Sequence, residues 1–176
     1  VTAEVIEESY RRFLRAFDAQ LQNSRFFFGN RPASSDFGIM GQLTCLALFD
    51  PTPSALTAEL APRVYGWTEL VEDLSGKEPR EDDWTDVSSL PDSLRGLFAE
   101  VGHFHAPFLL ANAEAVEKKA EQVETEIDGR PWVQKPFPYQ RKCLEWLRAS
   151  YASLDSDARA SVDNILEGSG CEILFA

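Results

Sequence analysis

The stretch from Ser34 to Phe49 constrains the fold more than any other part of this sequence, because nearly every residue in it is apolar or small. A surface helix carries a polar face toward water, and no such face can be drawn here. The stretch therefore predicts a helix that is buried on all sides at the centre of a helical bundle. Its glycines, Gly38 and Gly41, each cost about 1 kcal/mol in a helix interior, so they predict neighbouring helices that closely approach its backbone. The Pro-containing turn at 50–53 predicts its end.

Amphipathic patterns predict further helices on both sides of this segment. Residues 3–22 place apolar side chains from Ile6 to Leu21 on one face and charges on the other. The other helices are expected at 62–75, at 94–116 with a kink or split at Pro107, at 137–154, and in a short segment before Gly168. In the 137–154 helix, the spacing predicts that Tyr139, Cys143, Trp146, Leu147 and Leu154 face inward.

The apolar period changes from helical to alternating near residue 123. Val123, Thr125 and Ile127 alternate with glutamates up to Asp128-Gly129, which predicts a β-hairpin over about 123–134 with a tight turn. Residues 78–92 are rich in acids and contain two prolines, and they predict an exposed connector. The expected fold class is thus all-α with one small β-hairpin. Its expected organisation is a helical core at 1–76, an acidic connector at 77–92 and a helical extension at 93–176, packed on the core.

Composition limits the classes of partner. The formal net charge is −12, with 29 acidic and 17 basic residues, which disfavours nucleic acid and anionic membranes as partners. The basic pairs at 118–119 and 141–142 are interpreted as solvated helix faces. No stretch reaches the roughly 18 apolar residues that a membrane-spanning helix needs. The three cysteines are odd in number and widely spaced, which predicts a reduced, cytoplasmic protein.

No residue pattern predicts catalysis or metal binding. The two histidines, His103 and His105, could join Cys143 and Cys171 as zinc ligands by residue type. Residues two apart on a helix point about 200° apart, however, so we expect no metal site. Cys143 is expected to pack as a small hydrophobe rather than act as a nucleophile.

One aromatic group is a candidate for ligand binding. Trp132, Phe137 and Tyr139 stand beside two prolines and are typical either of a substrate pocket wall or of a hairpin docked onto helices by its rings. The second interpretation is favoured.

Residues 21–75 resemble the C-terminal helical domain of glutathione transferases. The matching pattern is Leu21, then Phe28-Gly29-Asn30-Arg31-Pro32, then Ser35-Asp36-Phe37, followed by Pro62, Val64 and Trp67. The resemblance implies a structural role for Asp36 at a buried helix start, since its carboxylate accepts backbone N–H groups there. The family usually has Ser or Thr three residues before this Asp, and here that residue is Ala33, so Ser34 or Ser35 is expected to help cap the helix.

The resemblance implies what surrounds this chain in a longer protein. The sequence begins at Val1, and its only methionine is Met40, which predicts a piece of a longer chain. The family binds glutathione mainly through a thioredoxin-like domain, and its first C-terminal helix would precede Val1. We therefore expect that domain as a partner in cis, glutathione as the cofactor of the whole protein, and no cofactor or catalytic residue within this chain.

Two functions stay open from the sequence. The first is the substrate-side domain of a glutathione transferase or thiol reductase, inactive when alone. The second is a non-catalytic transferase-like module for protein association, and a homodimer is compatible with both.

Overall fold

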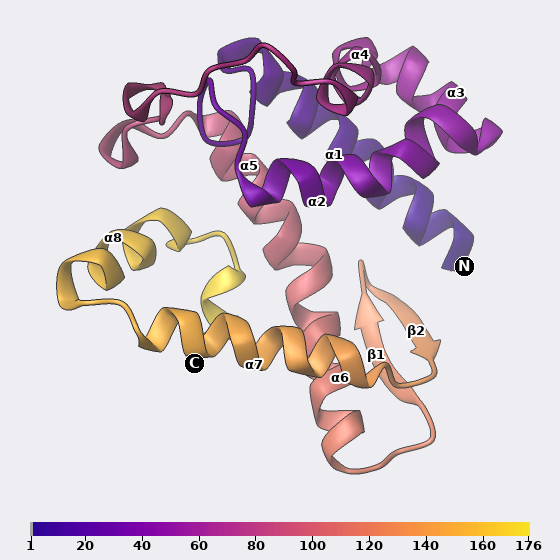
Figure 1. Cartoon of the computed structure of the whole chain (residues 1–176). Helices are drawn as coiled ribbons and strands as arrows, with labels where there is room; N and C mark the ends of the chain where they lie inside the picture. The colour runs from indigo at the N-terminus through magenta and orange to yellow at the C-terminus, as the bar shows by residue number, and fades with distance from the viewer. Residues whose placement is uncertain (1) are drawn as a thin grey trace. The chain divides into compact units, whose positions relative to one another are not determined.

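The computed structural model describes residues 2–176, and most of these residues are helical (Figure 1). Contacts divide the chain into two compact units. Tyr10–Leu97 is called here the central unit, because it is the middle part of the sequence. The residues up to Ser9 together with Phe98–Ala176 are called the outer unit, because they include both ends of the sequence. The only sheet among the described residues is a two-stranded hairpin. The all-α class with one small hairpin is therefore confirmed, whereas the expected division at residues 76 and 92 stays a prediction.

The central unit is built from helices joined by one long, irregular segment. The expected helices at 3–22 and 62–75 are confirmed as α1 and α4. The elements of the central unit in chain order are α1 (Thr2–Asn23), α2 (Ser34–Leu43), the π-helix η1 (Thr44–Phe49), α3 (Pro51–Leu60), α4 (Pro62–Glu72), the 3-10 turns η2 (Glu81–Asp83) and η3 (Val87–Ser89), and α5 (Asp92–Glu100). Helix α1 belongs to this unit from Tyr10 on, and α5 belongs to it up to Leu97.

Aromatic rings form the core of the central unit. Phe17 of α1 is fully buried. Its ring stacks on Phe27 with centroids 4.5 Å apart and meets Trp67 of α4 edge-on at 4.8 Å. The indole Nε1 of Trp67 donates to the carbonyl of Arg25 at 3.0 Å. The Phe26-Phe27-Phe28 run is therefore held onto the helices by ring packing and by this backbone contact.

The prediction that the 34–49 helix is buried on all sides is wrong. The helix exists, as α2 continued by η1, and it buries Asp36, Leu43 and Ala47. Phe37 and Phe49 are 53% and 87% exposed, however. A side chain added at Gly38 or Gly41 would meet nothing within 4 Å, so the expected close helix approach is also wrong. The reason is that α2 and η1 pack on α3 and α4 along one side, while apolar composition cannot say how many sides of a helix are covered.

The turn at 50–53 starts a helix that the sequence analysis did not predict. Asp50 is the N-cap of α3, and its Oδ1 accepts from the N–H of Thr52 at 3.3 Å. Pro51 stands in the first turn of α3, where a missing backbone donor costs nothing. The proline that ends one helix therefore begins the next.

The acidic connector has exposed side chains but an anchored backbone. Asn30 N donates to the Asp83 carbonyl at 2.7 Å, and Thr85 N donates to the Phe28 carbonyl at 2.8 Å. Gly29 lies between these bonds with φ of +132°, and a Cβ there would lie 2.1 Å from the Asp83 oxygen. Only glycine fits such a close approach of two backbones.

The outer unit combines a long helix, a hairpin and two further helices. The helix expected at 94–116 is confirmed. A π-helical stretch, Val101–His105, interrupts its α-helical pattern, and Pro107 follows in the first turn of α6 (Ala106–Glu117). The elements are η4 (Val101–His105), α6 (Ala106–Glu117), β1 (Val123–Ile127), β2 (Arg130–Gln134), α7 (Pro138–Ala152), α8 (Ser156–Leu166) and η5 (Cys171–Leu174).

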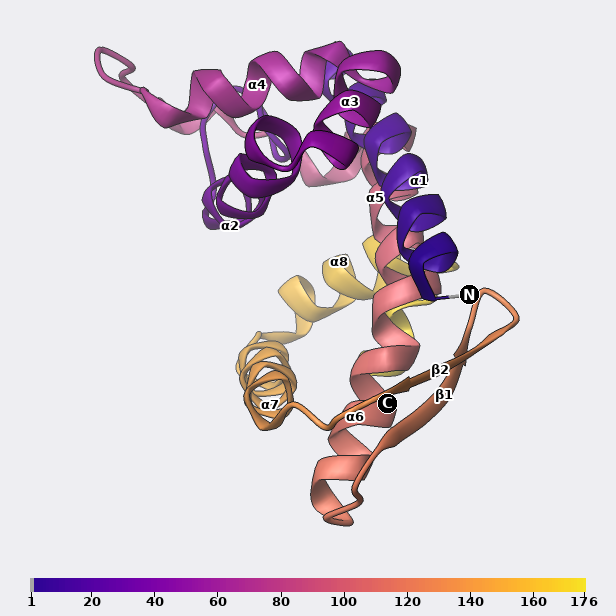
Figure 2. The same ribbon diagram turned by 90° about the vertical axis from the view of Figure 1, so that its right-hand side faces the viewer.

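The hairpin has the turn that its sequence predicts. Asp128 and Gly129 both have positive φ, 53° and 68°, which is the requirement of the tight primed turns that join antiparallel strands. Ile127 pairs with Arg130 and Val123 with Gln134. Val123 and Ile127 are buried with Phe108, Ala115 and Val5, so β1 packs on α6, as Figure 2 shows. The hairpin prediction at 123–134 is confirmed.

Helix α7 forms where expected but turns a different face inward. Its buried residue is Leu144, which packs with Ala106, Leu109 and Leu174. Trp146 and Tyr139 are 58% and 56% exposed, and Leu147 is also exposed. The prediction that these three side chains face inward is therefore wrong. The physical reason is that α7 carries two apolar faces, and the shape of its neighbours selects the one with Leu144.

No helix within residues 2–176 has the combination of length and apolarity that crossing a membrane requires.

Candidate functional site

Asp36 joins the start of α2 to the loop before it. Its Oδ2 accepts from Ala33 N at 2.8 Å and its Oδ1 accepts from Phe27 N at 3.0 Å, and the residue is fully buried. Burial raises the pKa of this carboxyl above its usual value, and the N–H donors of Ala33 and Phe27 oppose the rise. Ala33 is the N-cap residue, and Ser34 and Ser35 are the first two helical residues, so neither serine stands at the cap as expected.

A second buried polar side chain, Gln20, completes this anchor and was missed by sequence reasoning. Its Nε2 donates to the Phe27 carbonyl and to Ser24 Oγ, both at 2.9 Å, and its Oε1 accepts from Ser93 Oγ at 2.6 Å. Gln20 thereby links α1, the loop and the start of α5. The only sequence signal for this role was that Gln20 lies on the apolar side of α1, one residue before Leu21.

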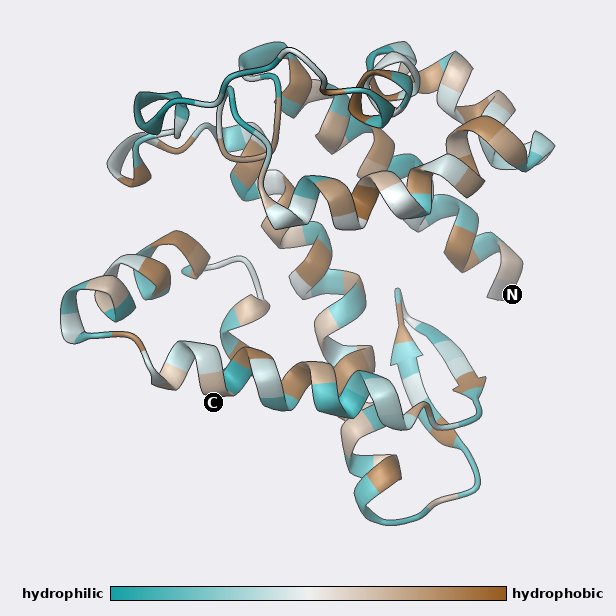
Figure 3. Ribbon diagram, in the orientation of Figure 1, coloured by the Kyte–Doolittle hydropathy of each residue, from teal (hydrophilic) through white to brown (hydrophobic). Residues whose placement is uncertain are grey.

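The outward side of α2 and η1 carries a mostly apolar, uncharged surface, called here the α2 face, on which the polar Gln42 is also exposed. It consists of Phe37, Gly38, Gly41, Cys45, Leu46 and Phe49, all exposed. The ribbon of α2 and η1 is mostly brown and white in Figure 3, in keeping with this uncharged composition. Large exposed apolar patches on protein surfaces commonly mark interaction sites.

The outer unit has a second exposed apolar surface at the start of α7. The ring of Tyr139 lies 6.3 Å from that of Phe137 and 6.0 Å from that of Trp146, the latter in a T-shaped arrangement. The backbone of Phe137 is clamped by the buried Asn112 of α6, since Phe137 N donates to Asn112 Oδ1 at 2.8 Å and Asn112 Nδ2 donates to the Phe137 carbonyl at 3.0 Å. The aromatic group is therefore held in place by an amide 25 residues away in sequence.

Trp132 does not belong to this aromatic group. Its ring packs edge-on against Phe104 at 6.1 Å and against Phe108 at 6.3 Å. Its Nε1 donates to Gln134 Oε1 at 3.0 Å. Of the three aromatic candidates, the structure brings Phe137 and Tyr139 together and places Trp132 between the hairpin and α6.

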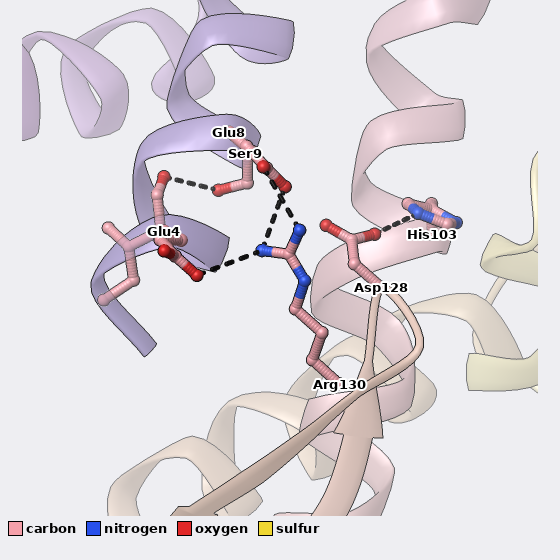
Figure 4. A network of polar contacts seen from close by, with 7 residues as sticks. Glu4, Glu8, Ser9, His103, Asp128 and Arg130 are labelled. Atoms are coloured by element: carbon pink, nitrogen blue, oxygen red, sulfur yellow. Dashed lines mark hydrogen bonds and ion pairs between the residues drawn. The ribbon is translucent and has the colours of Figure 1, made fainter. Parts of the chain in front are cut away.

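The charged residues of the outer unit form ion pairs around the hairpin turn (Figure 4). Arg130 lies 3.2 Å from Glu8 and 4.0 Å from Glu4, both on the first turns of α1. Asp128 is paired with Nε2 of His103. Two carboxylates one helical turn apart and one guanidinium thus attach the hairpin to α1, and the histidine attaches it to η4.

The two histidines and three cysteines carry the side chains of this chain that are suited to metal binding or thiol chemistry. Across residues 2–176, no three His, Cys, Asp or Glu side chains converge in a way that could hold a metal ion. All three cysteines are free thiols. Cys171 is buried and its Sγ lies 3.2 Å from the Phe98 carbonyl. Burial raises the pKa of this thiol, which favours its protonated form over the thiolate.

Comparison with known proteins identifies no relative, because no family model, no curated protein and no solved structure matches this chain. The resemblance to glutathione transferases therefore stays a hypothesis based on the quoted residues. The two apolar surfaces are the features of the structure from which a function has to be argued.

Proposed function

We propose that this chain is the substrate-side helical domain of a glutathione transferase-like protein and acts beside a thioredoxin-like domain. The observation that carries the proposal is the α2 face: a helix closed at its start by the buried Asp36 and bare along its outward side. A face of this length without a charge is costly to leave in water. The thioredoxin-like domain, or the further helix that the resemblance places before α1, would cover it.

In this proposal the chain supplies shape and apolar surface, and the other domain supplies the chemistry. Attack by glutathione needs a donor or a cation that stabilises its thiolate, together with groups that hold the peptide. The proposal assigns both tasks to the thioredoxin-like domain and leaves the bundle to contact an apolar substrate. The three free thiols agree with a reduced, cytoplasmic location.

The alternative is a transferase-like module for protein association. The observation that favours it is the clamped aromatic group of Phe137, Tyr139 and Trp146, since rings held on a surface are typical of protein interfaces. A homodimer is one form of this alternative.

Calorimetric titration with glutathione tests the proposal on two proteins, this chain and the same chain extended by its upstream residues. The chain alone is expected to give no binding heat and no conjugation of glutathione to an aromatic halide above the buffer rate. The extended protein is expected to do both. Micromolar binding by the chain alone, or inactivity of a folded extended protein, would reject the proposal, and the second result would favour the association module.

A variant pair tests the role of the α2 face in the extended protein. Phe49→Glu places a charge on that face, whereas Leu70→Glu places one on an exposed position of α4. We expect the first to weaken glutathione turnover and the second to leave it unchanged. Equal effects would mean that the α2 face is not where the two domains meet.

A further inference from the structure

The exposed apolar residues of α7 recur at the spacing of a helix contact face. The exposed Tyr139, Trp146 and Leu147 stand at relative positions i, i+7 and i+8, and the half-buried Cys143 stands at i+4. We call this set the α7 stripe. Such spacing places side chains in one row along a helix. It is also the spacing by which one helix contacts another in recognition complexes.

Packing on the opposite side prevents the α7 stripe from turning inward. Leu144 is 2% exposed and packs with Ala106, Leu109 and Leu174. Farther along α7, Arg148 Nε donates to the Leu174 carbonyl at 2.7 Å. Rotation of α7 to bury the stripe would break this contact and expose Leu144.

The rings of the α7 stripe are also ordered before any partner arrives. Asn112 fixes the backbone at Phe137, and Tyr139 packs edge-on against Trp146. Binding loses less conformational entropy when large side chains are already held in one arrangement. Aromatic residues of this kind carry much of the energy of protein interfaces.

The charge around the α7 stripe has the opposite sign to the charge of the chain. Residues 135–147, which lead into α7 and carry the stripe, contain three basic residues, Lys135, Arg141 and Lys142, and one acid, Glu145, in a chain of net charge −12. Glu145 is already bound to Arg141 at 3.0 Å. Lys135 and Lys142 are exposed, so the flank of the stripe presents positive charge to a partner.

We propose that the α7 stripe docks an amphipathic helix with acidic flanks, carried by a partner protein. The apolar row fixes the partner as a helix, and the exposed lysines fix the sign of its flanking charge. An anionic membrane is a poorer fit, because the chain as a whole carries a net charge of −12. The proposal is independent of the thioredoxin-like domain.

The test uses the full 176-residue chain and two labelled helical peptides that share leucines at i, i+3, i+4 and i+7. One peptide has glutamates on its flanks and the other has lysines. Fluorescence anisotropy is expected to show binding of the glutamate peptide at least about tenfold tighter than binding of the lysine peptide. The Tyr139→Ala/Trp146→Ala variant should lose at least about tenfold in affinity, and Lys142→Glu should reduce the preference for the glutamate peptide.

Val133→Ala is the matched control, because Val133 is an equally exposed apolar residue on the hairpin of the same unit. It should bind the glutamate peptide like the unmodified chain, and all variants should keep the circular dichroism of the parent. The proposal is overturned if both peptides bind equally, if the double variant binds fully, or if phosphatidylserine vesicles but not the peptide are bound. Light scattering that shows a dimer lost in the double variant would assign the stripe to a second copy instead.

Discussion

Helices α2 and α7 begin in similar ways, but only the start of α2 could be predicted from the sequence. Each start is clamped by one buried polar side chain that bonds two backbone groups: Asp36 for α2 and Asn112 for α7. Each helix then leaves an apolar surface exposed. The clamps differ in position, because Asp36 lies in the first turn of its own helix and Asn112 lies on another helix.

This difference explains why one clamp could be predicted and the other could not. An acid in the first helical turn accepts nearby backbone donors, so Asp36 is recognisable from local order alone. Asn112 bonds a residue 25 positions away, and nothing in the residues around it points to that partner. Local sequence patterns predict caps and turns, whereas long-range polar contacts depend on how helices pack against one another.

Truncation of Leu144 and Leu147 should have the largest and most unequal effects on α7. Leu144→Ala leaves a cavity among Ala106, Leu109 and Leu174, so we expect the free energy of unfolding to fall by about 3 kcal/mol. Leu147→Ala removes an exposed side chain and should cost about 0.5 kcal/mol or less. Urea denaturation measures both. A larger loss for Leu147 would mean that the α7 stripe is the buried face after all.

Removal of the α2 clamp should be the next largest effect. Asp36→Ala leaves the N–H groups of Phe27 and Ala33 without their acceptor in a buried place, and we expect a loss of about 2 kcal/mol. Asp36→Asn keeps one acceptor oxygen and should lose less. An unchanged urea midpoint for Asp36→Ala would show that the carboxylate does not hold this helix start.

Removal of the α7 clamp should cost less than removal of the α2 clamp. Asn112→Ala frees Phe137 N and the Phe137 carbonyl, but the exposed position of Phe137 lets water replace part of the amide, so we expect about 1 kcal/mol. Hydrogen exchange of the Phe137 amide should quicken strongly in this variant. If Asn112→Ala were instead as costly as Asp36→Ala, the two clamps would be equivalent.

Elsewhere in the chain, too, the features that could be predicted from the sequence are those that depend on local patterns. The helices at 3–22, 62–75, 94–116 and 137–154, and the hairpin turn at Asp128-Gly129, depend on local periodicity and turn chemistry, and all were found. The inward face of α7 was misjudged because Tyr139, Trp146 and Leu147 form as good an apolar row as the face that contains Leu144. The burial of α2 was misjudged because its one charged residue, Asp36, is buried, so no charged side marks the exposed surface.

The smallest expected effect bears directly on that exposed surface of α2. Alanine favours a helix interior over glycine by about 1 kcal/mol, since glycine loses more backbone freedom on folding. At Gly41 the new methyl group would meet nothing within 4 Å, so no clash opposes this gain. Gly41→Ala should therefore raise the free energy of unfolding of this chain by about 0.5–1 kcal/mol, measured by urea denaturation.

Gly102→Ala is the control, because its methyl group would lie 2.0 Å from the Ser169 carbonyl and should destabilise the chain. A loss of stability in Gly41→Ala would show that another helix covers α2 in solution. If the α2 face instead meets the proposed thioredoxin-like domain, the same substitution should stabilise this chain alone but weaken the attachment of that domain, because the methyl group would then stand where two surfaces must approach closely.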